Sequence, residues 1–180
     1  WLVGSEGHLI TNEHCIGSAS DAANTNFEFM AEGATCSTSC SSWGACAGVV
    51  EADTAELIKL SAPHDYTLVK LPTNLSTTYG FFQLRSSGAV VGERIYIPQH
   101  PQHYGKKIAL MAGSEYATVT SITQAACTSG ASYDDVGYYA DTQGGSSGSP
   151  VVSYGDNLVV ALHHCANCPN RGVPIQEVID

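Results

Sequence analysis

The sequence predicts an all-β protein made of short antiparallel strands. Short apolar segments rich in β-branched residues recur along the 180 residues, and Gly, Ser, Asn and Pro separate them. No segment carries the long apolar stripe of helical periodicity that marks an amphipathic helix. A chain of this length is long enough for one sizeable domain or for two small packed barrels.

The predicted strands follow one another almost from end to end. They lie at 1–3, 8–11, 57–60, 66–71, 89–91, 94–97, 108–111, 117–122, 151–153 and 158–163. Residues 174–179 are expected to form a short turn of helix, whereas the Gly- and Ser-rich segment 24–48 has no predictable course. Segment 72–88 is rich in Thr, Ser, Asn and Gly, so it is the best candidate for a crossing between two domains, 1–80 and 81–180.

The charge of the chain narrows the classes of partner. Seventeen acidic residues against seven Lys and Arg give a net charge of −10 at pH 7. Such a chain is repelled by nucleic acid and by anionic membranes, and neither is expected as a partner. No apolar run of about 18 residues is present, so we expect no transmembrane helix. No signal peptide is visible, because the chain starts inside a predicted strand. The composition suits a secreted protein.

Seven cysteines indicate an oxidising compartment and a fold held partly by disulfides. The odd count leaves at least one cysteine without a partner in the chain. Cys165 and Cys168 have the spacing of two zinc ligands, but a second pair at matching spacing is not evident, so disulfides are preferred. We expect no metal and no cofactor. Asn74 begins an Asn-Leu-Ser sequon and is a candidate glycosylation site.

Three segments carry the residue types of a nucleophilic triad. His14 ends an apolar stretch, Asp65 opens another, and Ser147 lies in the Gly-rich loop 144–150 before a hydrophobic strand. A serine hydroxyl becomes a nucleophile when an imidazole accepts its proton, and a buried carboxylate fixes the tautomer of that imidazole. We therefore predict Ser147 as nucleophile, His14 as general base and acid, and Asp65 as the orienting carboxylate. The backbone N–H groups of Gly145 and Ser147 are predicted to form the oxyanion hole.

These motifs resemble those of the trypsin-like (chymotrypsin-fold) serine peptidases, and within them the glutamyl endopeptidase branch. The string LITNEH at 9–14 is similar to that branch's leucine-threonine-asparagine-x-histidine signature. DTQGGSSGSP at 141–150 is similar to its serine loop, and VALH at 160–163 resembles one wall of its primary specificity pocket. The resemblance runs through the chain in motif order. It implies two antiparallel six-stranded β-barrels with the active site between them.

The resemblance implies a secreted serine endopeptidase that cleaves polypeptide substrates through an acyl-enzyme on Ser147, and it leaves two specificities open. Asp141 matches the aspartate at the floor of the trypsin pocket, which would favour Lys or Arg before the scissile bond. His163 matches the pocket histidine of the glutamyl branch, and together with Thr142 it would bind a Glu side chain. The sequence favours Glu.

The chain departs from the family before the catalytic histidine. Family members carry a few dozen residues there, whereas thirteen precede His14. The first barrel is therefore expected to lack its initial strands, and Cys15 is expected to pair with a cysteine outside the given chain. Six cysteines would then form three bridges of undetermined connectivity: Cys36, Cys40, Cys46, Cys127, Cys165 and Cys168.

An incomplete first barrel motivates an alternative of another class, a protease-derived structural or binding module. A broken barrel can misplace His14 although every catalytic residue is present. The exposed strand edge could also pair with another chain, giving self-assembly into a complex or a filament.

Overall fold

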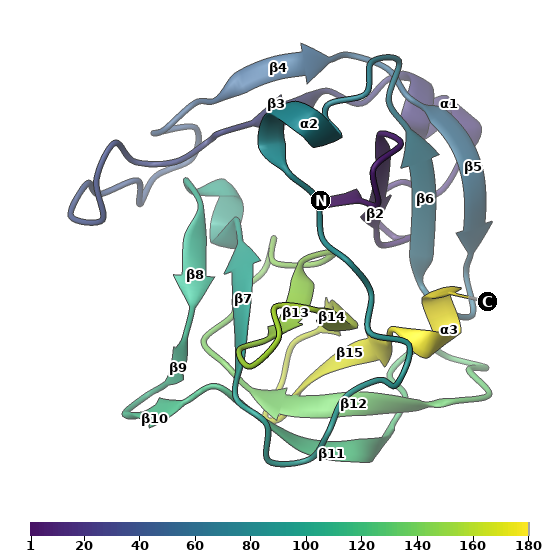
Figure 1. The fold of residues 1–180 in the computed structure, drawn as a ribbon, viewed down its shortest axis with the longest axis vertical. Helices are drawn as coiled ribbons and strands as arrows, with labels where there is room; N and C mark the ends of the chain where they lie inside the picture. Colours follow the sequence, from purple (N-terminus) through teal and green to yellow (C-terminus); the bar gives the residue numbers. More distant parts are fainter. Residues whose placement is uncertain (180) are drawn as a thin grey trace.

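The computed structural model describes residues 1–179, and nearly all of its regular structure is β (Figure 1). In chain order the elements are β1 (Leu2–Val3), β2 (His8–Thr11), α1 (Ala19–Ala23), β3 (Phe27–Phe29), β4 (Val49–Ala52), β5 (Glu56–Ser61), β6 (Tyr66–Lys70), α2 (Ser76–Tyr79), β7 (Ile95–Gln99), the 3₁₀ turn η1 (Pro101–His103), β8 (Lys107–Ala109), β9 (Met111–Ala112), β10 (Glu115–Tyr116), β11 (Thr118–Ala125), β12 (Asp134–Tyr139), β13 (Pro150–Ser153), β14 (Val159–Cys165), β15 (Asn170–Pro174) and α3 (Gln176–Ile179). The prediction of an all-β fold is confirmed.

Strands from the first part of the chain form a four-stranded antiparallel sheet in the order β1-β2-β6-β5, with β3 and β4 as a separate ribbon. The central pair, β2 and β6, places Leu9 opposite Val69 and Thr11 opposite Thr67. Apolar side chains from this sheet, from α1 and from the β3–β4 ribbon share one core. Its buried members are Leu2, Ile16, Ala22, Phe27, Ala55, Val69, Leu71 and Leu75.

Strands from the second part form a seven-stranded antiparallel sheet in the order β11-β12-β15-β14-β13-β7-β8. The sheet curls so that the start of β7 meets the start of β11, where the Ile95 amide donates to the Ala117 carbonyl at 2.9 Å. β14 lies at the centre and is buried from Val159 to His164. A chain segment buried on both faces keeps its side chains in fixed orientations, and β14 carries two of the histidines discussed below.

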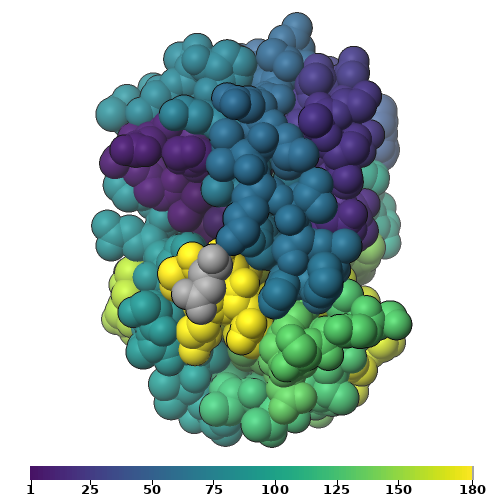
Figure 2. All heavy atoms as spheres, turned by 90° about the vertical axis from the view of Figure 1, so that its right-hand side faces the viewer, coloured from purple at the N-terminus to yellow at the C-terminus, as the bar shows by residue number. Residues whose placement is uncertain are grey.

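The two sheets pack on each other through a separate cluster of buried side chains. Its buried members come from both sheets and from the C-terminal segment: Ile10, Tyr66, Val152, Val159, Leu162, Val173, Ile175 and Val178. Figure 2 shows the C-terminal residues (yellow) at this junction, between the strands of the first sheet (blue) above and the β11–β12 region (green) below. The junction is therefore a continuous apolar core.

Two details of the sequence prediction are corrected. Within residues 1–179 neither sheet closes into a six-stranded barrel, because the sheets end at the edge strands β1, β5, β8 and β11. Residues 89–91 form no strand. The Glu93 carboxylate accepts a hydrogen bond from the Val90 amide at 2.6 Å, and the Glu93 amide donates to the Val90 carbonyl at 3.1 Å, so the chain turns here.

Two disulfides are present, Cys40–Cys46 and Cys127–Cys165, whereas Cys15, Cys36 and Cys168 are exposed and free. The prediction of three bridges is therefore wrong. A bridge requires Cα atoms closer than about 7 Å. Cys36 lies in the loop between β3 and β4, and Cys168 lies in the turn between β14 and β15, so the two belong to different sheets.

None of the helices within residues 1–179 has the length and the apolar character needed to cross a bilayer.

Candidate active site

Two of the predicted triad residues, His14 and Asp65, are in direct contact. His14 Nδ1 lies 3.0 Å from Asp65 Oδ1 and 2.9 Å from Asp65 Oδ2. The His14 backbone amide donates to Asp65 Oδ1 at 3.1 Å. Three contacts to one carboxylate hold the imidazole in a single orientation with Nδ1 directed at Asp65. This is the arrangement of a general base and its orienting acid.

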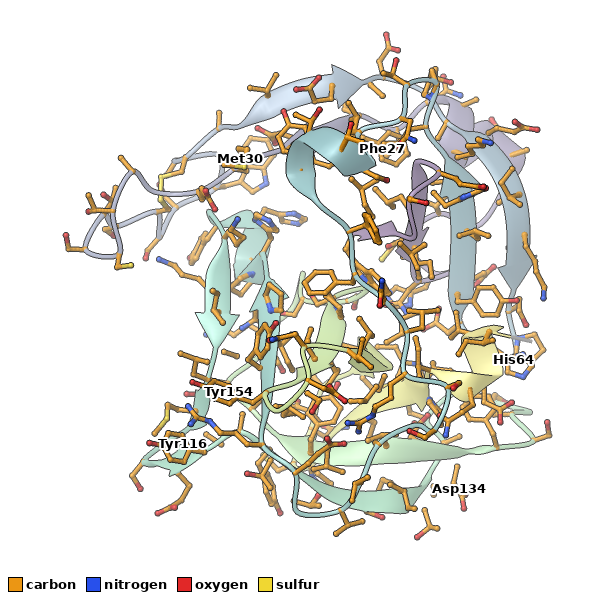
Figure 3. All side chains as sticks on the ribbon, viewed as in Figure 1. Phe27, Met30, His64, Tyr116, Asp134 and Tyr154 are labelled. Carbon is orange, nitrogen blue, oxygen red and sulfur yellow. A yellow bond between two sulfur atoms is a disulfide. The ribbon has the colours of Figure 1, made fainter. Side chains whose placement is uncertain are left out.

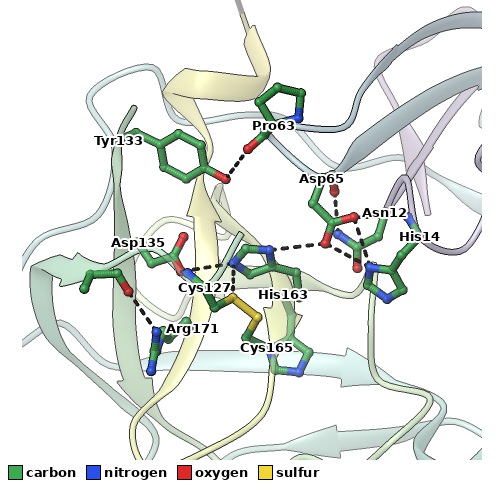
Figure 4. Close-up of a disulfide and its surroundings, with 12 residues drawn as sticks. Asn12, His14, Pro63, Asp65, Cys127, Tyr133, Asp135, His163, Cys165 and Arg171 are labelled. Carbon is green, nitrogen blue, oxygen red and sulfur yellow. Dashed lines mark hydrogen bonds and ion pairs between the residues drawn. A yellow bond between two sulfur atoms is a disulfide. The ribbon is translucent and has the colours of Figure 1, made fainter. Parts of the chain in front are cut away.

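The loop that carries Asp65 is held from both halves of the chain. Asp65 has a left-handed backbone with φ of 43°, and the Asn12 side-chain amide donates to its carbonyl at 2.8 Å. From the other sheet, the Tyr133 hydroxyl donates to the Pro63 carbonyl at 3.1 Å, and its ring stacks on His64 with centroids 5.1 Å apart. Figure 4 shows the Tyr133–Pro63 and Asn12–Asp65 hydrogen bonds near the Cys127–Cys165 disulfide. The position of Asp65 thus depends on both sheets.

Electrostatics keep this pair charged. The hydrogen bond that His14 donates to Asp65 raises the pKa of His14 from 6.5 to about 10, with a smaller contribution from Cys15, although partial burial opposes the shift. Burial tends to raise the pKa of Asp65, but the hydrogen bonds from His14 and His164 outweigh it and hold that pKa well below its usual range. Asp65 is therefore ionised at neutral pH.

The serine loop packs directly on the segment that carries His14. Gly148 has φ of +79°, and a Cβ at this position would lie 2.6 Å from Thr11 Oγ1 at the end of β2. The Gly148 amide donates to the His163 carbonyl at 2.9 Å, and the Trp1 indole donates to the Gly148 carbonyl at 2.8 Å. Ser147 is half-buried beside this contact. No hydrogen bond joins Ser147 to His14 within the described part of the chain.

The predicted oxyanion donors stay unoccupied by protein acceptors. Gly145 has φ of +93°, a conformation that glycine adopts without strain. The Gly144 carbonyl is held by the Gln102 amide at 2.6 Å. Among residues 1–179, no protein acceptor binds the N–H group of Gly145 or that of Ser147. Both groups are available to a ligand, and the oxyanion hole stays a prediction.

A cleft of about 800 Å³ runs past Ser147 between the two sheets. Cys15 and Gly145 are among its lining residues, and aromatic and aliphatic side chains form much of the rest. Phe27 and Met30, labelled in Figure 3, line it from the β3 side. The cleft is large enough to hold several residues of an extended peptide.

The predicted specificity residues have different surroundings. His163 is 3% exposed, its Nδ1 lies 2.6 Å from the Tyr138 hydroxyl, and burial lowers its pKa to about 4. Thr142 donates to Asn170 Oδ1 at 3.1 Å. Asp141 is exposed, so its carboxylate is not the desolvated charge that a pocket floor for Lys or Arg would require. Asn74, the candidate glycosylation site, is also exposed, and its side-chain amide donates to the Ser5 carbonyl at 2.8 Å.

A second histidine, His164, contacts Asp65, and it was not among the predicted catalytic residues. His164 Nδ1 lies 3.2 Å from Asp65 Oδ2, and its Nε2 lies 3.2 Å from Asp135 Oδ2. Burial tends to lower the pKa of His164, but the hydrogen bonds to Asp135 and Asp65 outweigh it and raise that pKa. A β-bulge between His163 and Cys165 interrupts the pairing with β15, and bulges redirect side chains. The adjacent histidines of a buried strand were the one signal available in the sequence.

A comparison with known protein families identifies the family of the chain. The profile of the trypsin-like peptidase domain matches residues 1–162. The chain belongs to this family. A curated relative of this trypsin-like domain is the "Secreted RxLR effector protein 73" of Plasmopara viticola, which is 54% identical over 180 residues. The match covers all of this chain and 44% of the relative, so the chain spans less than half the length of that protein.

Solved structures share the fold of this trypsin-like domain at low sequence identity. An inactive form of Rv3671c from M. tuberculosis H37Rv matches with a TM-score of 0.64 and 14% identity, over 98% of this chain and 75% of that chain. The MamO protease domain of Magnetospirillum magneticum matches with a TM-score of 0.62 and 17% sequence identity, over 99% of this chain and 84% of that chain. The HtrA-type protease AlgW with a decapeptide matches with a TM-score of 0.64 and 14% sequence identity, over 99% of this chain and 48% of that chain. These similarities support the chymotrypsin-like double-barrel architecture.

Proposed function

We propose that this chain is the catalytic domain of a secreted serine endopeptidase. The observation that carries the proposal is the contact of the Asp65 carboxylate with His14 Nδ1, on a segment against which the Ser147 loop packs. Family membership and the peptide-sized cleft support it. The description of the Plasmopara viticola relative as a secreted effector supports secretion.

In the proposed mechanism the Ser147 hydroxyl attacks the scissile carbonyl while His14 takes its proton. His14 then gives the proton to the leaving amine, and a water repeats the sequence to release the acyl group. Asp65 holds the imidazole and balances its charge, and the Gly145 and Ser147 amides stabilise the oxyanion. The Ser147 hydroxyl must approach His14 when substrate binds, and catalytic hydrogen bonds are often long in the absence of substrate.

For specificity we propose Glu before the scissile bond, as in the glutamyl endopeptidase branch. The exposed position of Asp141 supports this choice over Lys or Arg. His163 and Thr142 would bind the Glu carboxylate. A panel of peptides that differ only in Glu, Lys or Phe before the scissile bond separates these specificities.

A second candidate function is a binding module without catalytic activity. The absence of a hydrogen bond between Ser147 and His14 within residues 1–179 favours it, as does the effector description of the relative. Assembly through a strand edge belongs to this alternative.

A fluorophosphonate probe, which reacts with activated serines, separates the two functions. We expect labelling of the folded protein at Ser147, located by mass spectrometry of the labelled peptide. Labelling should vanish in Ser147→Ala and persist in Ser87→Ala, which alters an exposed serine outside the cleft. Heat-denatured protein is the second control. A folded protein that stays unlabelled would exclude the peptidase and leave the binding module.

The pH dependence of labelling tests the role of His14. A general base acts in its neutral form, so the labelling rate should rise with pH while His14 loses its proton. Because Asp65 raises the pKa of His14 towards about 10, the rising limb should lie well above 6.5. The measurement is the second-order rate constant of labelling between pH 6 and 11. A rate that is already constant above pH 7 would contradict the raised pKa.

A further inference from the structure

Two buried side chains, His164 and Asp135, lie beside the half-buried disulfide that joins the segment after β11 to the end of β14. The sulfur atoms of Cys127 and Cys165 lie within 4.8 Å of a ring nitrogen of His164. Among residues 1–179, these three residues are the one group of His, Cys, Asp or Glu side chains whose donor atoms are close enough together to bind a metal ion. Cys127 Sγ is 3.2 Å from His164 Nε2, and the same Nε2 is 3.2 Å from Asp135 Oδ2. The side chains of His164 and Asp135 are 1% and 0% exposed. Figure 4 shows the disulfide beside Asp135.

Asp135 carries an unsatisfied acceptor. Its Oδ2 accepts hydrogen bonds from the Cys127 amide at 3.0 Å and from His164, whereas its Oδ1 is buried without a hydrogen-bond partner. An unpaired buried carboxylate oxygen is costly, and a bound cation removes that cost. This observation is independent of the sulfur atoms and points to a positively charged ligand at the Asp135 carboxylate.

The donor atoms and their spacing suit zinc. Two thiolates, an imidazole and a carboxylate are the ligand types that Zn²⁺ takes in tetrahedral sites. Ordinary Zn–S and Zn–N or Zn–O distances place sulfur about 3.5 Å from nitrogen, and nitrogen about 3.3 Å from oxygen. Cys127 Sγ and Asp135 Oδ2 are each 3.2 Å from His164 Nε2. Two changes are needed. The bonded sulfurs must separate to about 3.8 Å, and the Asp135 carboxylate, which lies outside the group of donors that are all within 4.8 Å of one another, must move towards the sulfurs.

The other ring nitrogen of His164 already has the partner that a metal-bound histidine requires. Histidines that bind a metal through one nitrogen usually donate the other N–H to a carboxylate or a carbonyl, which fixes the ring. Here His164 Nδ1 lies 3.2 Å from Asp65 Oδ2, and this contact directs Nε2 towards the sulfurs. Asp65 would therefore orient the ligand without touching the metal.

We propose that reduction of the Cys127–Cys165 disulfide creates a zinc site formed by Cys127, Cys165, His164 and Asp135. A dithiol reductant passes two electrons and two protons to the sulfur atoms, which breaks the S–S bond and converts the dithiol to its own disulfide. Zn²⁺ then replaces the two thiol protons and any proton on His164 Nε2, and these protons go to solvent. The oxidised chain cannot form the site, because its sulfurs are bonded to each other. The inference does not depend on peptidase activity.

The test compares the oxidised and the reduced protein. Protein reduced with dithiothreitol and desalted anaerobically should bind one equivalent of Zn²⁺ tightly at this site, measured against a chromophoric chelator. Oxidised protein should bind none there. Co²⁺ in place of Zn²⁺ should give the sulfur-to-cobalt charge-transfer absorption and the intense bands of tetrahedral coordination. Equal metal binding by the oxidised and the reduced protein would overturn the proposal.

Variants separate this site from the other thiols. We expect Asp135→Asn and His164→Gln to weaken zinc binding at least tenfold, and Cys127→Ser with Cys165→Ser to abolish it. The matched control is Cys40→Ser with Cys46→Ser, which removes the other disulfide and should leave binding unchanged.

Alkylation gives a readout on the wild-type chain that needs no variant to fold. In the reduced protein, Zn²⁺ should slow iodoacetamide modification of Cys127 and Cys165 relative to the exposed Cys36, as measured by peptide mass spectrometry. Equal rates with and without Zn²⁺ would overturn the assignment.

Discussion

Replacement of Asp65 by Asn is expected to lower kcat of the proposed peptidase by about four orders of magnitude. The Asn side chain keeps the shape but loses the charge, and its NH₂ group cannot accept the proton of His14 Nδ1. The imidazole would then adopt the wrong tautomer, with its lone pair turned away from Ser147. The rising limb of the pH profile, which is assigned to His14, should also move down towards 6.5, because the hydrogen bond to Asp65 is the largest cause of the raised pKa of His14. Peptide hydrolysis from pH 6 to 11 measures both effects.

The matched control is Asp134→Asn, which neutralises an exposed carboxylate at the start of β12 (Figure 3). It should retain wild-type turnover. Thermal unfolding of both variants shows whether the fold is intact. Retention of a tenth or more of the activity by Asp65→Asn would remove Asp65 from the proposed mechanism.

Leu162→Ala is expected to cost roughly 2–5 kcal/mol of the free energy of unfolding. Leu162 is fully buried in β14 and belongs to the cluster that joins the two sheets, with Ile10 on one side and Val173 on the other. Truncation leaves a cavity that neither sheet can fill without moving relative to the other. Each kcal/mol lost lowers the melting temperature of a chain of this size by about 2–4 °C, so the midpoint of thermal unfolding should fall by roughly 4–20 °C. Urea unfolding and differential scanning calorimetry measure the two quantities.

Ile122→Ala is the control for this stability prediction. Ile122 lies in β11 with 48% of its surface exposed, so its truncation should change the free energy of unfolding by less than about 0.5 kcal/mol. Equal losses for the two variants would show that the cluster between the sheets does not hold them together.

Much of the site was predictable because its parts are short local strings. β2 and β6 combine apolar and β-branched residues, so both strands were predicted, together with His14 after one and Asp65 before the other. The Ser147 loop was predicted from its glycines. The division into domains 1–80 and 81–180 remains a prediction, although the two larger sheets draw their strands from opposite sides of segment 72–88.

Other features depended on contacts between distant residues. β12 reads DDVGYY and β15 reads NRGVP, so neither has the composition of a typical strand. They become strands because they pair with each other, and β15 also with the buried β14. The bulge that buries His164 has no local signature for the same reason.

The sequence by itself determined the all-β class, most strands and the three segments of the proposed triad, because each depends on neighbouring residues. Only the tertiary structure decided that Asp65 also contacts His164, that Asp135 contacts the other nitrogen of that ring, and that Cys127 pairs with Cys165 across 38 residues. These contacts join residues far apart in the chain. The Asp65–His164 contact comes from the packing of one sheet against the other, and the other two come from the curling of the seven-stranded sheet. Local propensity encodes neither.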